Sequence, residues 1–185
     1  MNDNNLKNKA VWQDYIINIP DYPKPGVGFK DITPLIGHAQ AFKSVIDELA
    51  VICERGDIRP EQLACPEARG FMFGSALAYR LGTGFLPVRK PGKLPRKTCG
   101  VEYELEYGTD SLQMHAEDII EGQRVVLIDD VLATGGTMAA CVKILQDNGA
   151  IVPACVFVME LDGLRGREKI TQQCPAVQVH SLITY

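Results

Sequence analysis

Apolar and amphipathic segments alternate along most of this chain. Arg124–Asp130 and Ile151–Met159 are strongly apolar, which predicts strands buried on both faces of a sheet. His38–Arg55 repeats apolar residues at helical spacing and is followed by Gly56, a pattern typical of an amphipathic helix. Similar patterns predict further strands at Gln62–Pro66, Gly84–Arg89 and Val177–Tyr185, and further helices at Lys9–Asn18, Phe71–Leu81, Thr137–Asn148 and Gly166–Gln172.

The order of these elements predicts an α/β fold with a mostly parallel central sheet flanked by helices. Val101–Glu106 and Ser111–His115 predict an antiparallel hairpin. The segment PDYPKPGVGF, residues 20–29, predicts a loop. We expect residues 1–185 to form one domain, because a chain of this length can bury a substantial core. Ligands of such sheets bind beyond the carboxyl ends of the strands, so the loops there are the candidate site.

The overall charge argues against a large anionic partner. The 185 residues include 19 basic and 23 acidic side chains, a net charge of −4, whereas binding to nucleic acid or an anionic membrane needs dense positive surface. The six cysteines form no C-x-x-C pair and the three histidines are scattered, so no zinc site is predicted. The first twenty residues lack the apolar core of a signal peptide, and no apolar run could span a bilayer, so we expect a cytoplasmic location.

The strongest local signal is the segment VVLIDDVLATGGT, residues 125–137. An apolar strand ends at Asp129 and Asp130, and a glycine-containing turn then leads into a helix. Backbone N–H groups of the turn and of the helix N-terminus can hold a phosphate, and the two carboxylates can accept hydrogen bonds from ribose hydroxyls or lie near Mg²⁺. For TGG alone an ordinary glycine-rich connection is the simpler interpretation, but the combination favours a ribose 5-phosphate site. The phosphate would lie against Ala133, Thr134, Gly135, Gly136 and Thr137.

Two further segments carry cations suited to a diphosphate. Glu67, Ala68 and Arg69 lie between a predicted strand and a predicted helix, where a guanidinium could bind two oxygens of a diphosphate at once, although a surface arginine is an equal alternative. Residues 89–97, here called the basic loop, place five cations among prolines and a glycine. A solvated loop is the usual interpretation of such a run. A polyphosphate ligand would favour contacts from Arg89, Lys90 and Lys93, and less strongly from Arg96 and Lys97.

These motifs together resemble those of the type I phosphoribosyltransferases, and within that family the adenine-specific branch. The resemblance extends from about Ile19 to Lys169. DDVLATGGT resembles the family's signature for 5-phosphoribosyl 1-diphosphate (PRPP). PDYPKPGVGFKDITPL, EARGFMFG, VRKPGKLPRKT, YELEYG and MELDGLRGREK resemble the other motifs of the adenine-specific branch, in the same order.

The resemblance implies the reaction of adenine with PRPP to give AMP and diphosphate. It implies a flexible hood over about residues 88–116 that closes on the site. It also implies a catalytic role for Arg69 and a non-proline cis peptide near Glu67–Ala68. Spacing alone leaves Glu102, Glu104 and Glu106 open as the proton partner of the purine, and the LEYG match selects Glu106 as catalytic.

The resemblance further implies the remaining partners. Phe29, Lys30 and Leu161 would contact adenine, mostly through main-chain groups and apolar surface. Mg²⁺ would be the cofactor, held mainly by the oxygens of PRPP and not by a protein metal site. A homodimer is implied, with no nucleic-acid or membrane partner. A transferase for hypoxanthine, guanine or xanthine is the first alternative, and a PRPP-sensing regulatory module is the second.

Overall fold

The structure is a computed structural model that describes residues 11–105 and 108–185. Its contacts divide the chain into two compact units, Met1–Asp47 and Glu48–Tyr185. The helix α2, Ala39–Cys53, runs across this division. Within the described residues, no helix is long and apolar enough to cross a membrane.

The first unit contains a short antiparallel pair of strands. Its elements are the 3-10 helix η2 (Trp12–Tyr15), β1 (Ile17–Ile19), β2 (Phe29–Asp31), α1 (Thr33–Gly37) and the start of α2. The predicted helix over Lys9–Asn18 is therefore wrong beyond Tyr15, because Ile17 and Ile19 pair with β2 as a strand, a conformation that β-branched residues favour. The strand β2 was not predicted either, because it follows a segment rich in proline and glycine.

The second unit contains a five-stranded sheet in the order β4-β3-β7-β8-β9, and all of its pairs are parallel. This confirms the predicted fold class. The predicted strands and helices of this unit are all present, with ends that shift by up to three residues. The strands are β3 (Gln62–Pro66), β4 (Gly84–Val88), β7 (Val125–Leu132), β8 (Ala154–Glu160) and β9 (Gln178–Thr184).

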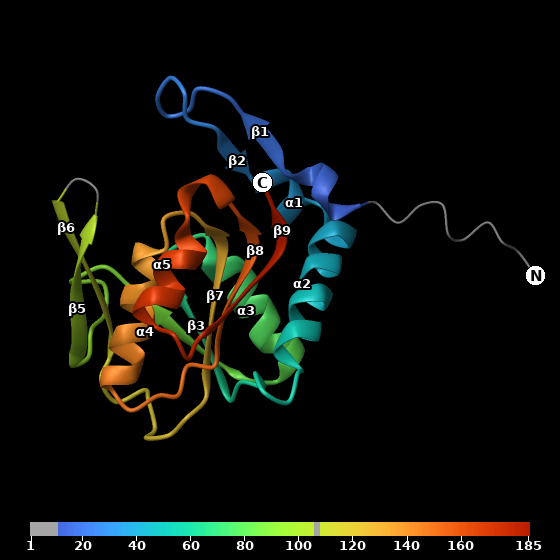
Figure 1. The fold of residues 1–185 in the computed structure, drawn as a ribbon. Helices are drawn as coiled ribbons and strands as arrows, with labels where there is room; N and C mark the ends of the chain where they lie inside the picture. The colour runs from blue at the N-terminus through green and yellow to red at the C-terminus, as the bar shows by residue number, and fades with distance from the viewer. Residues whose placement is uncertain (1–10, 106–107) are drawn as a thin grey trace, which may run out of the picture. The chain divides into compact units, whose positions relative to one another are not determined.

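Three helices connect these strands. They are α3 (Gly70–Leu81), α4 (Gly136–Asp147) and α5 (Gly166–Gln173), and a 3-10 helix, η3 (Asp162–Leu164), precedes α5. The chain moves from β3 to β4 in one direction across the sheet and from β7 to β8 and β9 in the other. Right-handed crossovers therefore place α3 on one face and α4 and α5 on the opposite face, as Figure 1 shows.

The core of this unit fills the space between the sheet and its helices. β8 is buried at every position, and β7 is buried at its first four. All six cysteines are free thiols, and four of them are buried. In β7 and β8 the charged residues, Asp129, Asp130 and Glu160, lie toward the carboxyl ends of the strands.

A separate hairpin stands beside α4 (Figure 1). It consists of β5 (Thr98–Leu105) and β6 (Gly108–His115), which pair antiparallel along their whole length. The predicted hairpin is thus confirmed, with strands that extend back to Thr98 and Gly108. Arg89, the first residue of the basic loop, exchanges two backbone hydrogen bonds with Gln113 of β6 at 2.8 and 2.7 Å.

Candidate active site

Two adjacent carboxyl groups lie near the carboxyl end of β7. Asp130 is 2% exposed, whereas Asp129 is only partly buried. Asp129 Oδ1 accepts a hydrogen bond from the backbone N–H of Asp130 at 2.9 Å. Burial raises the pKa of Asp129 well above its ordinary value, and the neighbouring Asp130 charge raises it further. Burial also raises the pKa of Asp130, although the Arg69 guanidinium opposes this rise. Hydroxyl donors from a ligand would favour the charged form of both groups.

The turn after β7 brings backbone donors to the same place. Residues Ala133–Thr137, here called the phosphate loop, lead into α4 through Gly135, whose φ of +78° lies in the left-handed region that favours glycine. A β-carbon on Gly135 would also lie 2.5 Å from the carbonyl oxygen of Gly166. Because Gly135 is the N-cap and has no side chain, the first N–H groups of α4 receive no cap from that residue. These donors, with the helix dipole, suit an anion.

The loop between β3 and α3 lies beside the two carboxyl groups. The peptide bond Glu67–Ala68 is cis, as the family resemblance implies. Arg69 Nε forms an ion pair with Asp130 Oδ2 at 3.0 Å. A β-carbon on Gly70 would lie 2.6 Å from Asp129 Oδ1 and 3.2 Å from Asp129 Cα, so only glycine allows α3 to begin this close to β7.

The two loops and the end of β7 enclose a cavity of about 250 Å³. Nine of the predicted ligand-binding residues line it, while Gly136 lies at a neighbouring cavity. The structure therefore brings together the residues that were predicted to bind ribose, the 5-phosphate and the diphosphate. They meet at the carboxyl ends of adjacent parallel strands. The nine residues are Glu67, Ala68, Arg69, Asp129, Asp130, Ala133, Thr134, Gly135 and Thr137.

The basic loop does not line this cavity. Arg89 Nε donates to Glu67 Oε2 at 2.7 Å, so Arg89 is tied to a residue of the cavity wall. Lys90 Nζ pairs with Asp110 of the hairpin, and Lys93 is exposed. Arg89 and Lys90 are thus held by carboxylates of the chain itself.

A tyrosine joins the hairpin to the phosphate loop. The Tyr103 hydroxyl donates to Asp110 Oδ2 at 3.1 Å and lies 3.4 Å from Thr137 Oγ1. Burial raises the pKa of the Tyr103 hydroxyl. The Lys90 ammonium, through its hydrogen bond and charge, holds the pKa of Asp110 below its ordinary value. Lys90, Asp110, Tyr103 and Thr137 therefore form a continuous polar chain.

The remaining predicted site residues lie elsewhere. Phe29 and Lys30 are partly buried residues of β2 in the first unit, and the Phe29 ring packs edge-on against Tyr22 at 5.3 Å between ring centres. Leu161 follows β8 directly and is partly buried. Glu106 lies outside the described residues. None of the three residues predicted to contact adenine therefore lines the cavity.

The donor set of the cavity suits a magnesium ion that is shared with a ligand. Among residues 11–105 and 108–185 there is no group of three metal-ligating side chains. Asp129 and Asp130 supply hard oxygen atoms, and Mg²⁺ is commonly held by one or two carboxylates, waters and substrate phosphates. The donors present thus suit an ion that arrives with a phosphorylated ligand.

Sequence reasoning missed several supporting residues. Gly70 and Gly166 permit backbone contacts that exist only in the folded chain. Asp110 and Tyr103 could not be recognised in the sequence. The partner of Asp110, Lys90, lies 20 residues away, and Thr137 lies 34 residues from Tyr103. Glu160 carried a usable signal, since a carboxylate that ends a fully apolar strand requires a partner.

Comparison with known proteins first identifies the class. The family model for the phosphoribosyl transferase domain matches residues 35–181. This range contains four strands of the sheet and the first part of β9, together with both loops of the cavity and the hairpin.

Individual relatives then identify the branch. The chain is 57% identical to the adenine phosphoribosyltransferase of Dichelobacter nodosus over 86% of this chain and 91% of the relative. The crystal structure of the enzyme from Thermoanaerobacter pseudethanolicus superimposes with a TM-score of 0.87 at 51% identity, covering 94% and 97% of the two chains. The Saccharomyces cerevisiae enzyme, solved with adenine and an imino-altritol bisphosphate, gives 0.82 at 36% identity, covering 85% and 91%. The chain belongs to the adenine phosphoribosyltransferase branch of the phosphoribosyltransferase family.

Proposed function

We propose that this chain transfers the 5-phosphoribosyl group of PRPP to adenine, giving AMP and diphosphate in purine salvage. The observation that carries the proposal is the cavity in which the paired carboxyl groups of β7, the N-terminus of α4 and Arg69 face one space. Each of these groups matches one part of PRPP, and the relatives named above carry the same activity in their names.

The phosphate loop holds the 5-phosphate in this proposal. Backbone N–H groups near Gly135, Gly136 and Thr137 and the hydroxyls of Thr134 and Thr137 supply its donors. The carboxylates of Asp129 and Asp130 accept hydrogen bonds from the two ribose hydroxyls. The sugar is thereby fixed with its reacting carbon turned toward the Glu67–Arg69 loop.

Arg69 and the basic loop stabilise the departing diphosphate. A guanidinium has five N–H donors, so Arg69 can pair with Asp130 and with diphosphate oxygens at once. Glu67 and Ala68 shape this loop. Arg89, Lys90 and Lys93 attract the same group, and Lys90 exchanges Asp110 for the substrate. Mg²⁺ bound to PRPP neutralises charge on the diphosphate. Cleavage through an oxocarbenium-like state depends on such positioning and charge, and no covalent intermediate is required.

Adenine is held by Phe29, Lys30 and Leu161 in this proposal. Phe29 and Leu161 offer apolar surface, and main-chain groups near Lys30 pair with the edge of the base. Glu106 accepts the ring proton that adenine loses when its N9 bonds to the ribose carbon. We further propose that the active form is a cytoplasmic homodimer.

The test is incubation of the protein with PRPP, Mg²⁺ and a panel of nucleobases, with the nucleotides identified by chromatography. AMP formed from adenine, at a rate well above that of any other nucleotide, supports the proposal. A product formed only from hypoxanthine, guanine or xanthine would show the alternative purine specificity. PRPP binding without any product would point to the regulatory module.

Glu106 is tested separately. Glu106→Gln should lower turnover sharply while PRPP affinity stays close to that of the wild type, because the amide cannot accept a proton. Glu102→Gln, four residues earlier in the sequence, is the matched control. Equal turnover in the wild type and Glu106→Gln would remove Glu106 from the reaction.

A further inference from the structure

A buried carboxylate ends the most apolar strand of the sheet. Glu160 is 3% exposed and is the last residue of β8, in which all seven residues are buried. An ionised carboxylate in such a place requires charge-assisted partners. Its partner comes from α5, seven residues further along the chain.

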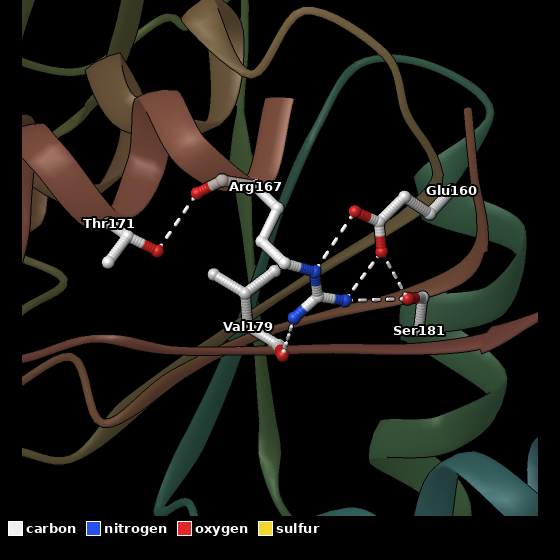
Figure 2. A network of polar contacts seen from close by, with 5 residues as sticks. All are labelled: Glu160, Arg167, Thr171, Val179 and Ser181. Atoms are coloured by element: carbon white, nitrogen blue, oxygen red, sulfur yellow. Dashed lines mark hydrogen bonds and ion pairs between the residues drawn. The ribbon is translucent and has the colours of Figure 1, made fainter. Parts of the chain in front are cut away.

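Arg167 binds this carboxylate through two of its nitrogens (Figure 2). Its Nε donates to Glu160 Oε1 at 3.0 Å, and its Nη2 donates to Glu160 Oε2 at 2.5 Å. A bidentate pair of this kind fixes direction as well as distance. The side chain of Arg167 therefore sets where the N-terminal end of α5 lies relative to the end of β8.

The same guanidinium also reaches β9. Its Nη1 donates to the carbonyl oxygen of Val179 at 2.5 Å, and its Nη2 donates to Ser181 Oγ at 2.9 Å. Ser181 in turn donates to Glu160 Oε2 at 2.6 Å. Figure 2 shows how these contacts join two strands and one helix through one side chain. Burial would raise the pKa of Glu160, but the bonds from Arg167 and Ser181 outweigh it and lower that pKa.

The residue before Arg167 lies against the phosphate loop. A β-carbon on Gly166 would overlap the carbonyl oxygen of Ala133 and lie 3.0 Å from the backbone nitrogen of Gly135. The contact is reciprocal, because a β-carbon on Gly135 would lie 2.5 Å from the oxygen of Gly166. The backbone of α5 thus forms one wall behind the loop that presents N–H donors to the cavity.

We infer that Arg167 is a positioning residue for PRPP binding, which acts by clamping Gly166 against the phosphate loop while its guanidinium is anchored on Glu160. This inference rests on the proposed function, since it assigns PRPP to the phosphate loop. Arg167 itself does not line the cavity of the described residues. Its effect on PRPP passes through the backbone contact between Gly166 and residues 133–135.

The inference predicts a selective effect on PRPP. Arg167→Met should raise the KM for PRPP about tenfold, with a much smaller change in kcat. Arg167→Lys keeps the charge but loses the bidentate geometry, so it should give an intermediate KM. Glu168→Gln is the matched control, because it removes an exposed ion pair with Arg165 from the same turn of α5. It should leave both constants within about twofold of the wild type.

The contact between Gly166 and the phosphate loop is tested by substitutions at two glycines. Gly166→Ala should raise the KM for PRPP at least as much as Arg167→Met, because the methyl group displaces the loop. Gly163→Ala is the control three residues earlier, where a β-carbon would meet nothing within 4 Å. It should behave like the wild type.

Melting temperatures separate positioning from a merely structural role. Variants with lower melting temperature but a wild-type KM for PRPP, measured well below the transition, would overturn the inference. If Arg167→Met does not fold, Arg167→Lys and Ser181→Ala decide the question by the same readout. A wild-type protein that makes no AMP refutes the proposed function instead, so the two failures are distinguishable.

Discussion

The phosphate loop and the basic loop both face the negatively charged parts of PRPP in our account, yet they are built differently. The phosphate loop is held by backbone contacts and close glycines, and its neighbours Asp130 and Glu160 are buried. The basic loop is largely exposed, and three of its cations pair with side-chain carboxylates, among them Glu67 and Asp110. Buried backbone geometry defines where a ligand lies, whereas exposed charge attracts it and adjusts to it. Substitutions should therefore be far more costly in the first loop.

The largest expected effect comes from Gly135→Ala. The substitution meets both a positive φ of +78° and a contact of 2.5 Å with the Gly166 oxygen. Strain of this kind costs about 1–3 kcal/mol before any clash is counted, so PRPP affinity should fall more than about 100-fold. Isothermal titration with PRPP and Mg²⁺ measures this.

Gly92→Ala is the matched control in the basic loop. Gly92 has nearly the same φ, +76°, but a β-carbon there meets nothing within 4 Å. The affinity of this variant for PRPP should change by less than about threefold, because the exposed loop can relax the strain and the added β-carbon displaces no neighbouring group. Equal losses in the two glycine variants would contradict the difference between the loops.

Asp129→Asn should have the next largest effect. The amide is a weaker acceptor than a carboxylate, so one charge-assisted hydrogen bond to a ribose hydroxyl is weakened. We expect the KM for PRPP to rise about tenfold or more, which corresponds to about 1.4 kcal/mol. Steady-state kinetics at saturating adenine measures this, with Asp162→Asn as a control in η3. An unchanged KM would refute the ribose role of Asp129.

A smaller effect, of opposite sign, is expected in the basic loop. Asp110→Asn removes the carboxylate that competes with PRPP for Lys90. The KM for PRPP should fall about threefold at low salt, a change typical of a single ion pair that remains partly exposed to solvent. The change should shrink as salt is added. Asp118→Asn, which frees Arg96 instead, is the control. A higher KM in Asp110→Asn would show that Asp110 orients Lys90 and does not compete for it.

The smallest expected effect concerns stability in acid. The folded pKa of Glu160 lies below its ordinary value of 4.5, so its ion pair contributes stability above that pH. The contribution is lost as the pH falls through the folded pKa. The melting temperature of Glu160→Gln should therefore be several degrees below that of the wild type at pH 7 and approach it as the pH falls through the folded pKa of Glu160. A difference that persists unchanged at low pH would contradict the assigned charge state.

Sequence patterns predicted the sheet because its strands are apolar and its helices end at recognisable residues. β3 was predicted residue for residue, and Gly82 ends α3 in the left-handed conformation typical of a helix C-terminus. β1 and β2 could not be predicted in this way. They are only three residues long, and their pairing depends on a tertiary contact and not on a local pattern.

Part of the candidate site, like part of the fold, could be predicted from the sequence. Asp129, Asp130 and the phosphate loop were recognisable, because strand, acids, glycines and helix are contiguous in the sequence. The contact between Glu160 and Arg167 could not be recognised in the sequence, because it forms where β8, α5 and β9 meet in the folded chain. Local sequence identifies groups that bind a ligand directly, whereas the residues that position those groups become visible only in the folded chain.

A crystal structure of the protein with AMP tests the central claim most directly. We predict that the 5′-phosphate lies within hydrogen-bond distance of the backbone nitrogens at the start of α4. The ribose hydroxyls should meet Asp129 and Asp130. A phosphate bound instead by the cations of the basic loop, with the cavity beside Arg69 unfilled, would contradict the account.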